Sequence, residues 1–334
     1  MLPSLKPSLS PSSGFEPLLS LLQPQLNAVN ACLLQKMESP VALIPEIAGY
    51  LISLGGKRLR PLLTIASAEL CGYKGERHIH LAACVEFIHT ATLLHDDVVD
   101  ESTLRRGMET ANSLWSNKAS VLVGDFLFSR AFELMVADGS LEVLGILSRA
   151  SSAISEGEVL QLSMSHSLEL TQETYLKIIE SKTARLFSAA TEVGAVVAEA
   201  PDEKRQALTQ FGRSLGVAFQ LMDDVLDYTA RQSQLGKTIG DDFREGKVTL
   251  PLLLAYQSGC ETSFWEDMLA KKSRDNHDLQ KALILLNKSS ALVESKKLTE
   301  AYVNEALTCL TKFPPSPLKS AMEELAHFSL HREM

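Results

Sequence analysis

The sequence predicts an all-α protein, organised as a single large bundle of helices. Apolar residues recur at helical spacing in almost every segment after residue 16, and the alternation typical of strands is scarce. No change in composition divides the 334 residues into separate parts. We therefore expect a disordered tail over residues 1–15, rich in serine and proline, followed by one domain of roughly a dozen helices over residues 16–334.

Glycines, prolines and capping residues mark the ends of the expected helices. Gly72 and Gly139 each follow an apolar run, where a glycine commonly ends a helix, and Thr171 is a suitable N-cap. Glycines also interrupt a polar loop over residues 236–246. The expected helices cover residues 16–37, 41–54, 60–71, 78–103, 111–138, 141–165, 171–200 and 202–230, a short stretch from Pro251, and three smaller stretches within residues 277–330.

Composition excludes several classes of protein. A chain that is 45% hydrophobic and 22% charged is ordinary globular protein, and a net charge of −9 disfavours a nucleic-acid partner. Five scattered cysteines without a C-x-x-C pair argue against a disulfide framework or a zinc site. No apolar run approaches the roughly 20 residues that span a bilayer, and the N-terminal residues lack the pattern of a signal peptide. We therefore expect a cytoplasmic protein.

The first candidate site is an acidic cluster at the end of an apolar, helix-spaced run. Asp96 and Asp100 are four residues apart, so they share one helix face and repel each other unless a cation lies between them. Oxygen ligands favour Mg²⁺ over zinc, and Mg²⁺ usually keeps positions open for substrate phosphates. Asp97 points away from this face. For this cluster alone, a metal site and a solvated acidic helix end are equally good interpretations.

A second acidic cluster changes that balance. Asp223 and Asp227 repeat the one-turn spacing, Asp224 lies between them, and Gln220 lies on the same side of the expected helix. Both clusters follow apolar sequence, where an unpaired carboxylate is costly. Two such clusters favour a metal–phosphate site over two solvated faces.

Basic residues that could bind an anion lie in small islands between the apolar helices. Lys57, Arg58 and Arg60 follow a glycine pair at the start of a helix, where backbone N–H groups point at a bound anion. A solvated loop is the alternative. Arg105 and Arg106 lie just after the first cluster, where they could also compensate its negative charge.

Further polar residues interrupt apolar sequence. Lys182 and Thr183 lie in mid-helix, although a single lysine there usually only extends its ammonium group to solvent. Lys237 and Lys247 lie in the glycine-containing loop, which suggests a lid over the site or simply a solvated loop. His89 precedes Asp96 by two turns on the same face, so we expect it to contact a ligand rather than to be only a core residue.

Taken together, these motifs resemble those of the trans-isoprenyl diphosphate synthases, the polyprenyl synthetase family, and in particular its long-chain type. The resemblance covers nearly the whole chain after the tail. The matching motifs are Gly55–Pro61, Glu86–Asp100 with Arg105–Gly107, Gly124–Phe126, Lys182–Thr183, Phe219–Asp227, and Gly236–Asp242 with Gly246–Lys247. The family's fold, the isoprenoid synthase fold, is an all-α bundle around a central apolar cavity.

The resemblance implies a role for each matching residue. Isopentenyl diphosphate would be bound by Lys57, Arg60, His89 and Arg106. The allylic diphosphate would be held by Arg105, Lys182, Thr183, Gln220, Lys237 and Lys247. Mg²⁺ would be coordinated by Asp96, Asp100 and Asp223, with Asp97, Asp224 and Asp227 assisting directly or through water.

The implied reaction needs no protein nucleophile. Positive charge in the site promotes departure of diphosphate from the allylic substrate, and the apolar bundle shields the allylic cation from water. The double bond of isopentenyl diphosphate attacks head to tail, and the released diphosphate takes the proton. The family also implies a homodimer, with at most transient contact with a membrane during product release.

The resemblance also implies that product length is set in the helix before the first cluster. Ala91 lies five residues before Asp96, about 7.5 Å back along the helix axis. Short-chain members of the family carry a bulky aromatic residue near this position. Because Ala91 and Thr92 are small, we expect a long all-trans product of about C40–C50, as for a ubiquinone side chain. Close helix packing also uses small residues, so a shorter farnesyl- or geranylgeranyl-type product is the alternative.

Three other functions fit the sequence less well. A terpene cyclase of the same fold normally replaces the second aspartate cluster. A regulatory subunit of a heteromeric prenyl synthase tends to lose aspartates, and here all six remain. An acidic cation-binding helical protein without a reaction does not explain the basic islands.

Overall fold

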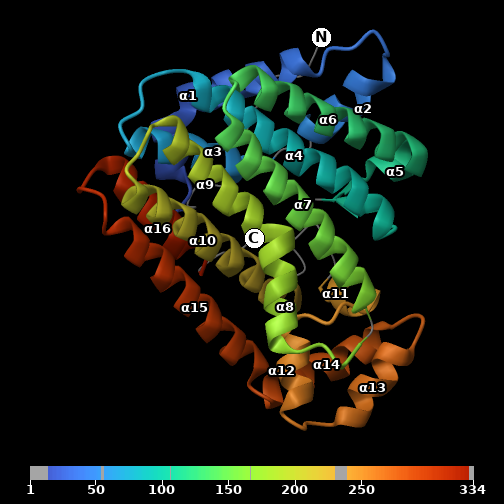
Figure 1. The fold of residues 1–334 in the computed structure, drawn as a ribbon. Coiled ribbons are helices and arrows are strands. Elements are labelled where there is room, and N and C mark those ends of the chain that lie inside the picture. The colour runs from blue at the N-terminus through green and yellow to red at the C-terminus, as the bar shows by residue number, and fades with distance from the viewer. Residues whose placement is uncertain (1–13, 54–55, 106, 166, 230–238, 331–334) are drawn as a thin grey trace.

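The computed structural model describes residues 14–53, 56–105, 107–165, 167–229 and 239–330, and it confirms the all-α fold (Figure 1). Within these residues the only sheet is a two-stranded antiparallel hairpin of β1 (Leu104–Arg105) and β2 (Met108–Glu109). The helices are α1 (Glu16–Lys36), α2 (Leu43–Ser53), α3 (Leu59–Leu70), α4 (Arg77–Val99), α5 (Ala111–Leu114), α6 (Asn117–Asp138), α7 (Leu141–Ser163), α8 (Gln172–Ile179), the π-helical turn η1 (Glu180–Ala184), α9 (Arg185–Val197), α10 (Asp202–Thr229), α11 (Asp241–Glu245), α12 (Leu250–Gln257), α13 (Thr262–Ala270), α14 (Asn276–Lys288), α15 (Ala291–Leu310) and α16 (Pro317–Phe328).

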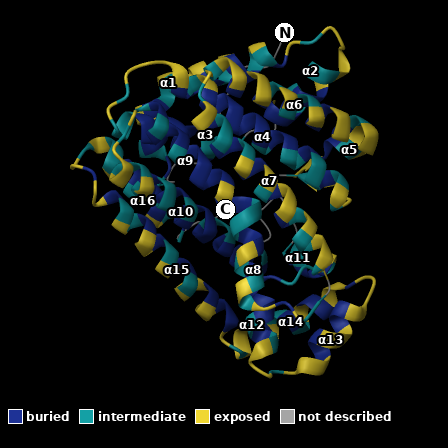
Figure 2. Cartoon of the chain, in the orientation of Figure 1, coloured by how far each residue is buried: buried dark blue, intermediate teal, exposed yellow. Residues whose placement is uncertain are grey.

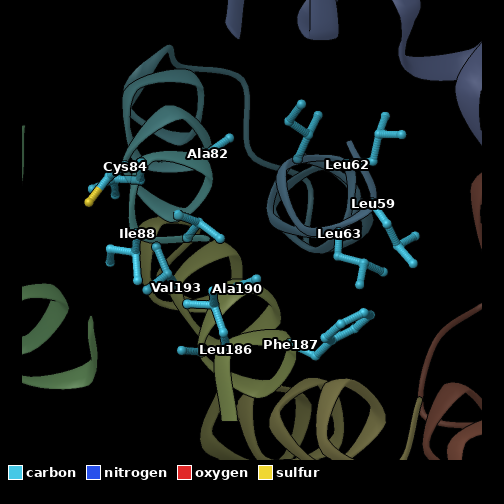
Figure 3. Packing of buried hydrophobic residues seen from close by; sticks show 14 of the residues in the cluster. Leu59, Leu62, Leu63, Ala82, Cys84, Ile88, Leu186, Phe187, Ala190 and Val193 are labelled. Carbon is cyan, nitrogen blue, oxygen red and sulfur yellow. The ribbon is translucent and has the colours of Figure 1, made fainter. Parts of the chain in front are cut away.

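The main core lies between helices in the middle of the molecule, where Figure 2 shows the deepest burial. Side chains of α3, α4 and α9 interlock there, among them Leu62, Ile88 and Phe187 (Figure 3). α10 packs along α9 on one side and α15 on the other. Burial of this continuous apolar surface is the main term that holds the helices together.

A second apolar cluster surrounds the C-terminal part of α10. It combines Val225 of that helix with Leu252 of α12, Trp265 of α13 and Leu285 of α14. The second acidic cluster is therefore held on a helix that is packed at both ends, which fixes its position.

Several helix ends confirm the sequence prediction. The Thr171 hydroxyl accepts from the Thr174 amide as an N-cap, and Gly139 ends α6 with a φ of 78°. All five cysteines are free thiols, and Cys84 is fully buried. None of the described helices is long and apolar enough to cross a membrane.

Other helix boundaries were predicted wrongly. The helix expected over residues 78–103 ends at Val99, because the chain turns there into the hairpin and Glu101 takes a left-handed conformation. The helix expected over residues 111–138 is divided into α5 and α6, since the Ser116 hydroxyl caps a new start at the Ala119 amide. The expected loop contains the short helix α11, and α13 was not predicted.

The N-terminal tail predicted over residues 1–15 lies almost entirely outside the described residues. At its end Phe15 is 1% exposed, and α1 begins at the next residue. Gly14 packs against Phe328 of α16.

Candidate active site

The first acidic cluster lies at the C-terminal end of α4, and its three carboxylates have different surroundings. Asp97 is fully buried and binds Arg105 of β1, whose Nη2 lies 2.7 Å and Nε 3.0 Å from Oδ1. The Asn112 side chain donates to the backbone carbonyl of Asp97 and fixes the turn. Asp96 and Asp100 remain partly exposed, so they are the members of this cluster that a ligand can reach.

The second cluster lies near the end of α10. Asp227 accepts from the backbone amides of Asp241 at 3.1 Å and Asp242 at 3.2 Å. Asp224 is 3% exposed and accepts from the Tyr175 hydroxyl and from Gln220. Asp223 is partly exposed, so the two clusters each present at least one accessible carboxylate.

Two consecutive residues of the π-helical turn connect the clusters. Lys182 donates to Glu158 at 2.7 Å and to Gln161 at 2.9 Å, both on α7, and its charge acts on Asp96. The Thr183 hydroxyl donates to the side-chain oxygen Oε1 of Gln220, on α10, at 2.8 Å. The two acidic clusters therefore border one site.

Glycines on the neighbouring helices allow this turn to fit. A Cβ added at Gly157 of α7 would lie 2.8 Å from Cβ of Ser181, and one at Gly216 of α10 would lie 2.6 Å from Cα of Ala184. The wider π-helical turn is thus held between two helices at close approach. Such turns in a helix often occur at functional sites.

Lys247 closes the site from the side of the loop after α11. Its Nζ lies 3.0 Å from Oδ2 of Asp100 and 2.7 Å from Oε2 of Glu245. Burial acts to lower the pKa of Lys247, but the carboxylates of Asp242, Asp100 and Glu245 together raise it well above its usual range. Lys247 therefore stays charged, and it ties the first cluster to the segment that follows the second.

A pocket of about 150 Å³ lies at this meeting point. Its polar wall contains Lys182, Thr183, Gln220, Asp224 and Lys247, and apolar side chains of α8 complete it. Four of the six residues expected at the allylic diphosphate thus line one pocket, whereas Arg105 lies outside its lining and Lys237 outside the described residues.

Three of the carboxyl groups lie in surroundings that disfavour their charged form. Burial raises the pKa of Asp96 to about 7; Lys182 and Arg105 act to lower this pKa, whereas Glu158 and Asp100 act to raise it. Burial, followed by the charge of Asp242, raises the pKa of both Asp224 and Asp227 to about 8. A divalent cation would relieve this repulsion and lower all three values.

A second basic group lies at the start of α3. Arg60 is partly buried with its guanidinium 4.5 Å from the centre of the Phe187 ring, and its Nη1 donates to Nε2 of His89 at 3.1 Å. Burial lowers the pKa of Arg60 to about 10, although Glu86 and Asp223 act to raise it. The influence of Asp223 places this group next to the second acidic cluster.

The other basic residues expected at this second group differ in their surroundings. The Arg58 guanidinium binds Glu86 and donates to the Ile52 carbonyl, so it holds the chain before α3 in place. The Lys57 ammonium lies 4.9 Å from the centre of the Phe328 ring of α16. Arg106 and Lys237 lie outside the described residues.

The two residues expected to set product length lie on α4. Ala91 is fully buried. The Thr92 hydroxyl donates to the backbone carbonyl of His89 at 2.8 Å. Its hydrogen-bond donor is therefore satisfied within α4. Both positions are small, as the sequence indicates.

The structure adds residues that the sequence prediction missed. Glu158 and Gln161 share one face of α7 and bind Lys182. Asp242 acts on Asp224 and Asp227, and Tyr175 binds Asp224. Glu158 and Gln161 lie three residues apart, and this spacing on one helix face is a signal that could have been noticed. Tyr175 has no such signal, because it lies 49 residues from its partner.

Comparison with known proteins gives relatives along nearly the whole chain. The polyprenyl synthetase family model matches residues 41–286. Over 321 residues the chain is 44% identical to the octaprenyl diphosphate synthase of Escherichia coli (strain K12), which covers 96% of this chain and 99% of that protein. A polyprenyl synthase from Caulobacter crescentus CB15, complexed with calcium and isoprenyl diphosphate, has a TM-score of 0.93 at 49% identity, covering 98% of this chain and 100% of that one. A decaprenyl diphosphate synthase from Rhodobacter capsulatus has a TM-score of 0.91 at 47% identity, covering 96% and 99%.

Proposed function

This chain belongs to the polyprenyl synthetase family, and we propose that it is a Mg²⁺-dependent prenyltransferase that makes a long all-trans polyprenyl diphosphate. It condenses isopentenyl diphosphate head to tail onto an allylic diphosphate until the product reaches about C40–C50. Such a product suits the side chain of a quinone. The long-chain relatives at 44% and 47% identity support this product range.

The observation that carries the proposal is the connection between the two acidic clusters. The charge of Lys182 acts on Asp96, Thr183 binds Gln220, and Lys247 binds Asp100 while it borders the same pocket. Two separate cation sites would not need lysines and a threonine between them. One site that binds a diphosphate needs both the carboxylates and the basic residues.

The residues at this site fit Mg²⁺. Asp96, Asp100 and Asp223 are partly exposed carboxylates, and the pKa of Asp96 is raised, mainly by burial, so a bound cation would stabilise its charged form. Oxygen ligands suit a hard divalent cation. The calcium in the Caulobacter relative supports a divalent metal in this family.

The bound metal would supply positive charge that stabilises the departing diphosphate. In this chain Lys182, Lys247 and Arg105 each bind a carboxylate, namely Glu158, Asp100 and Asp97. They supply further positive charge for the allylic diphosphate. Arg60 and His89 provide a separate pair of donors for isopentenyl diphosphate, and the apolar core beyond them excludes water from the allylic cation.

The family also suggests a homodimer, which we propose for this chain. Apolar side chains lie exposed along the outer face of α6, with Leu122 and Val136 each 68% exposed and Phe132 44% exposed. Leu122 and Val136 are fourteen residues apart, which places them on the same helix face. A second copy packed on this face would bury them.

The function can be tested by incubating the purified protein with isopentenyl diphosphate, farnesyl diphosphate and Mg²⁺. Chromatography of the lipid product should give a product of about C40–C50. A C15 or C20 product would support the shorter-chain alternative. No condensation at all would support a non-catalytic subunit and contradict the proposal.

A further inference from the structure

Tyr175 of α8 is part of the wall of the pocket that Lys182 and Thr183 line, and no motif draws attention to it. It is 3% exposed, and its hydroxyl donates to Oδ2 of Asp224. We propose that Tyr175 is a positioning residue for the allylic diphosphate, acting through Asp224 and Gln220 on Thr183. This inference rests on the proposed function, because it concerns the same site.

The first step of this connection fixes Gln220. Both oxygens of the Asp224 carboxylate have a protein donor, since Oδ2 accepts from Tyr175 and Oδ1 accepts from Nε2 of Gln220 at 2.8 Å. With Tyr175 and Gln220 as the donors, both Asp224 oxygens act as acceptors. The Gln220 amide must therefore turn its NH₂ group to Asp224 and its carbonyl away from it.

The second step fixes Thr183. The Gln220 carbonyl accepts from the Thr183 hydroxyl at 2.8 Å. Thr183 is 7% exposed and lies in the wall of the pocket, next in sequence to Lys182. The Tyr175 hydroxyl thus determines, through two intervening side chains, where the Thr183 hydroxyl stands when a diphosphate enters.

This arrangement also separates two neighbouring aspartates by role. Asp224 is held by protein donors on both oxygens, whereas Asp223 is the partly exposed member of the pair. Loss of the Tyr175 hydroxyl should therefore affect binding of the allylic substrate and leave the dependence on Mg²⁺ unchanged. A tyrosine that only packs in the apolar cluster of α8, α10 and α12 would affect neither.

The test measures steady-state kinetics of Tyr175→Phe, which keeps the ring and removes the hydroxyl. Loss of a donor to a buried oxygen should raise the KM for farnesyl diphosphate about tenfold. The KM for isopentenyl diphosphate and the half-saturating Mg²⁺ concentration should stay at the wild-type values. Tyr256→Phe is the matched control, because that hydroxyl binds Glu266 at 3.3 Å on the exposed surface, away from the pocket.

A double-mutant cycle identifies the route of the effect. If Tyr175 acts through Thr183, adding Tyr175→Phe to Thr183→Val should change the farnesyl diphosphate KM by less than about twofold. An undiminished effect of Tyr175→Phe in that background, or an equal rise in both substrate KM values, would overturn the proposal. Should Tyr175→Phe fail to fold, Gln220→Met breaks the same connection and is expected to give the same rise in KM.

The outcome can be kept apart from that of the proposed function. Calorimetry with inorganic diphosphate and Mg²⁺ measures binding without turnover, and Tyr175→Phe should weaken this binding about tenfold relative to wild type. If the wild type makes product but Tyr175→Phe has the same kinetics and the same diphosphate binding, the proposed role of Tyr175 is wrong and the proposed function stands. If the wild type makes no product, this binding difference still decides the role of Tyr175.

Discussion

Three aspartates of the acidic clusters give up their protons far less readily than an ordinary carboxyl group. The pKa of Asp96 is raised from 3.8 to about 7, and those of Asp224 and Asp227 are raised to about 8, mainly by burial. In the unfolded chain these groups would ionise at lower pH. Without a cation, folding therefore costs more free energy as they become charged.

This leads to a prediction for stability against pH. Without Mg²⁺, the folded state holds protons that the unfolded state has already lost between its carboxyl pKa and about 8, so the free energy of unfolding should fall as pH rises through that range. Because Mg²⁺ binds the ionised form, it should raise the Tm more at pH 8 than at pH 6. Thermal unfolding at both pH values, with and without Mg²⁺, checks this.

The matched control for that experiment is Asp125→Asn, which removes a 63% exposed carboxylate of α6. This variant should keep the wild-type dependence on pH and Mg²⁺. Asp227→Asn should reduce the fall in stability with pH. An Mg²⁺ effect of equal size at pH 6 and pH 8 would contradict the account.

For single residues, the sequence predicted which side chains belong to the site but not which partner each of them binds. Asp96, Asp97 and Asp100 look alike in sequence, yet only Asp97 is fully buried against an arginine. Spacing on the helix indicates which face a side chain takes. It does not indicate which partner arrives from a distant element, as Arg105 does for Asp97.

Among the elements, the π-helical turn between α8 and α9 has the most consequence for function. It places Lys182 and Thr183 toward different clusters although they are adjacent in sequence. Gly216 of α10 lies so close to Ala184 that no side chain fits between them. The geometry of the turn is therefore set by α10 as much as by its own residues.

We expect Gly216→Ala to separate α10 from this turn. The added Cβ would meet Cα of Ala184 at 2.6 Å, so the free energy of unfolding should fall by about 1–3 kcal/mol, and prenyl transfer should fall with it. Denaturant unfolding and the product assay measure both effects. Gly49→Ala on α2 is the control, since a Cβ there meets nothing within 4 Å. Equal free energies of unfolding for the two variants would argue against the close approach of Gly216 to Ala184.

The sequence predicted most helices because caps and glycines lie next to the apolar runs they end, as at Thr171 and Gly139. It did not predict the π-helical turn, because the glycines that permit it belong to α7 and α10. The end of α4 was placed too late, because the hairpin that turns the chain depends on Asn112, a residue beyond it.

For the molecule as a whole, the main question is how far the product extends into the bundle. Ala91 is fully buried on α4, one of the helices of the main core. If the product grows past this position, a large side chain there should stop it. The family resemblance suggested this residue, but the packing of several helices decides how much room exists beyond it.

Ala91→Tyr should therefore shorten the product by several isoprene units, measured by chromatography of the lipid. Ala91→Ser adds little volume and should keep the wild-type product length. A product of unchanged length from active Ala91→Tyr protein would show that chain length is set elsewhere.

The exposed face of α6 gives a prediction for assembly. Leu122→Glu places a charge on this face and should convert a dimer of the 36.6 kDa chain into a monomer, measured by sedimentation. Ile284→Glu is the control, because Ile284 of α14 is 66% exposed but belongs to another surface. A wild-type monomer, or dissociation by Ile284→Glu alone, would contradict an interface on α6.

The central claim is that the two acidic clusters form one metal–diphosphate site. It is tested most directly by a crystal structure with Mn²⁺ in place of Mg²⁺ and an unreactive allylic thiodiphosphate, in which anomalous scattering locates the metal. We predict manganese bound by Asp96 and Asp100 on one side and by Asp223 on the other, with one diphosphate between them in contact with Lys182. Manganese bound at only one cluster, or a diphosphate that contacts neither, would contradict the account.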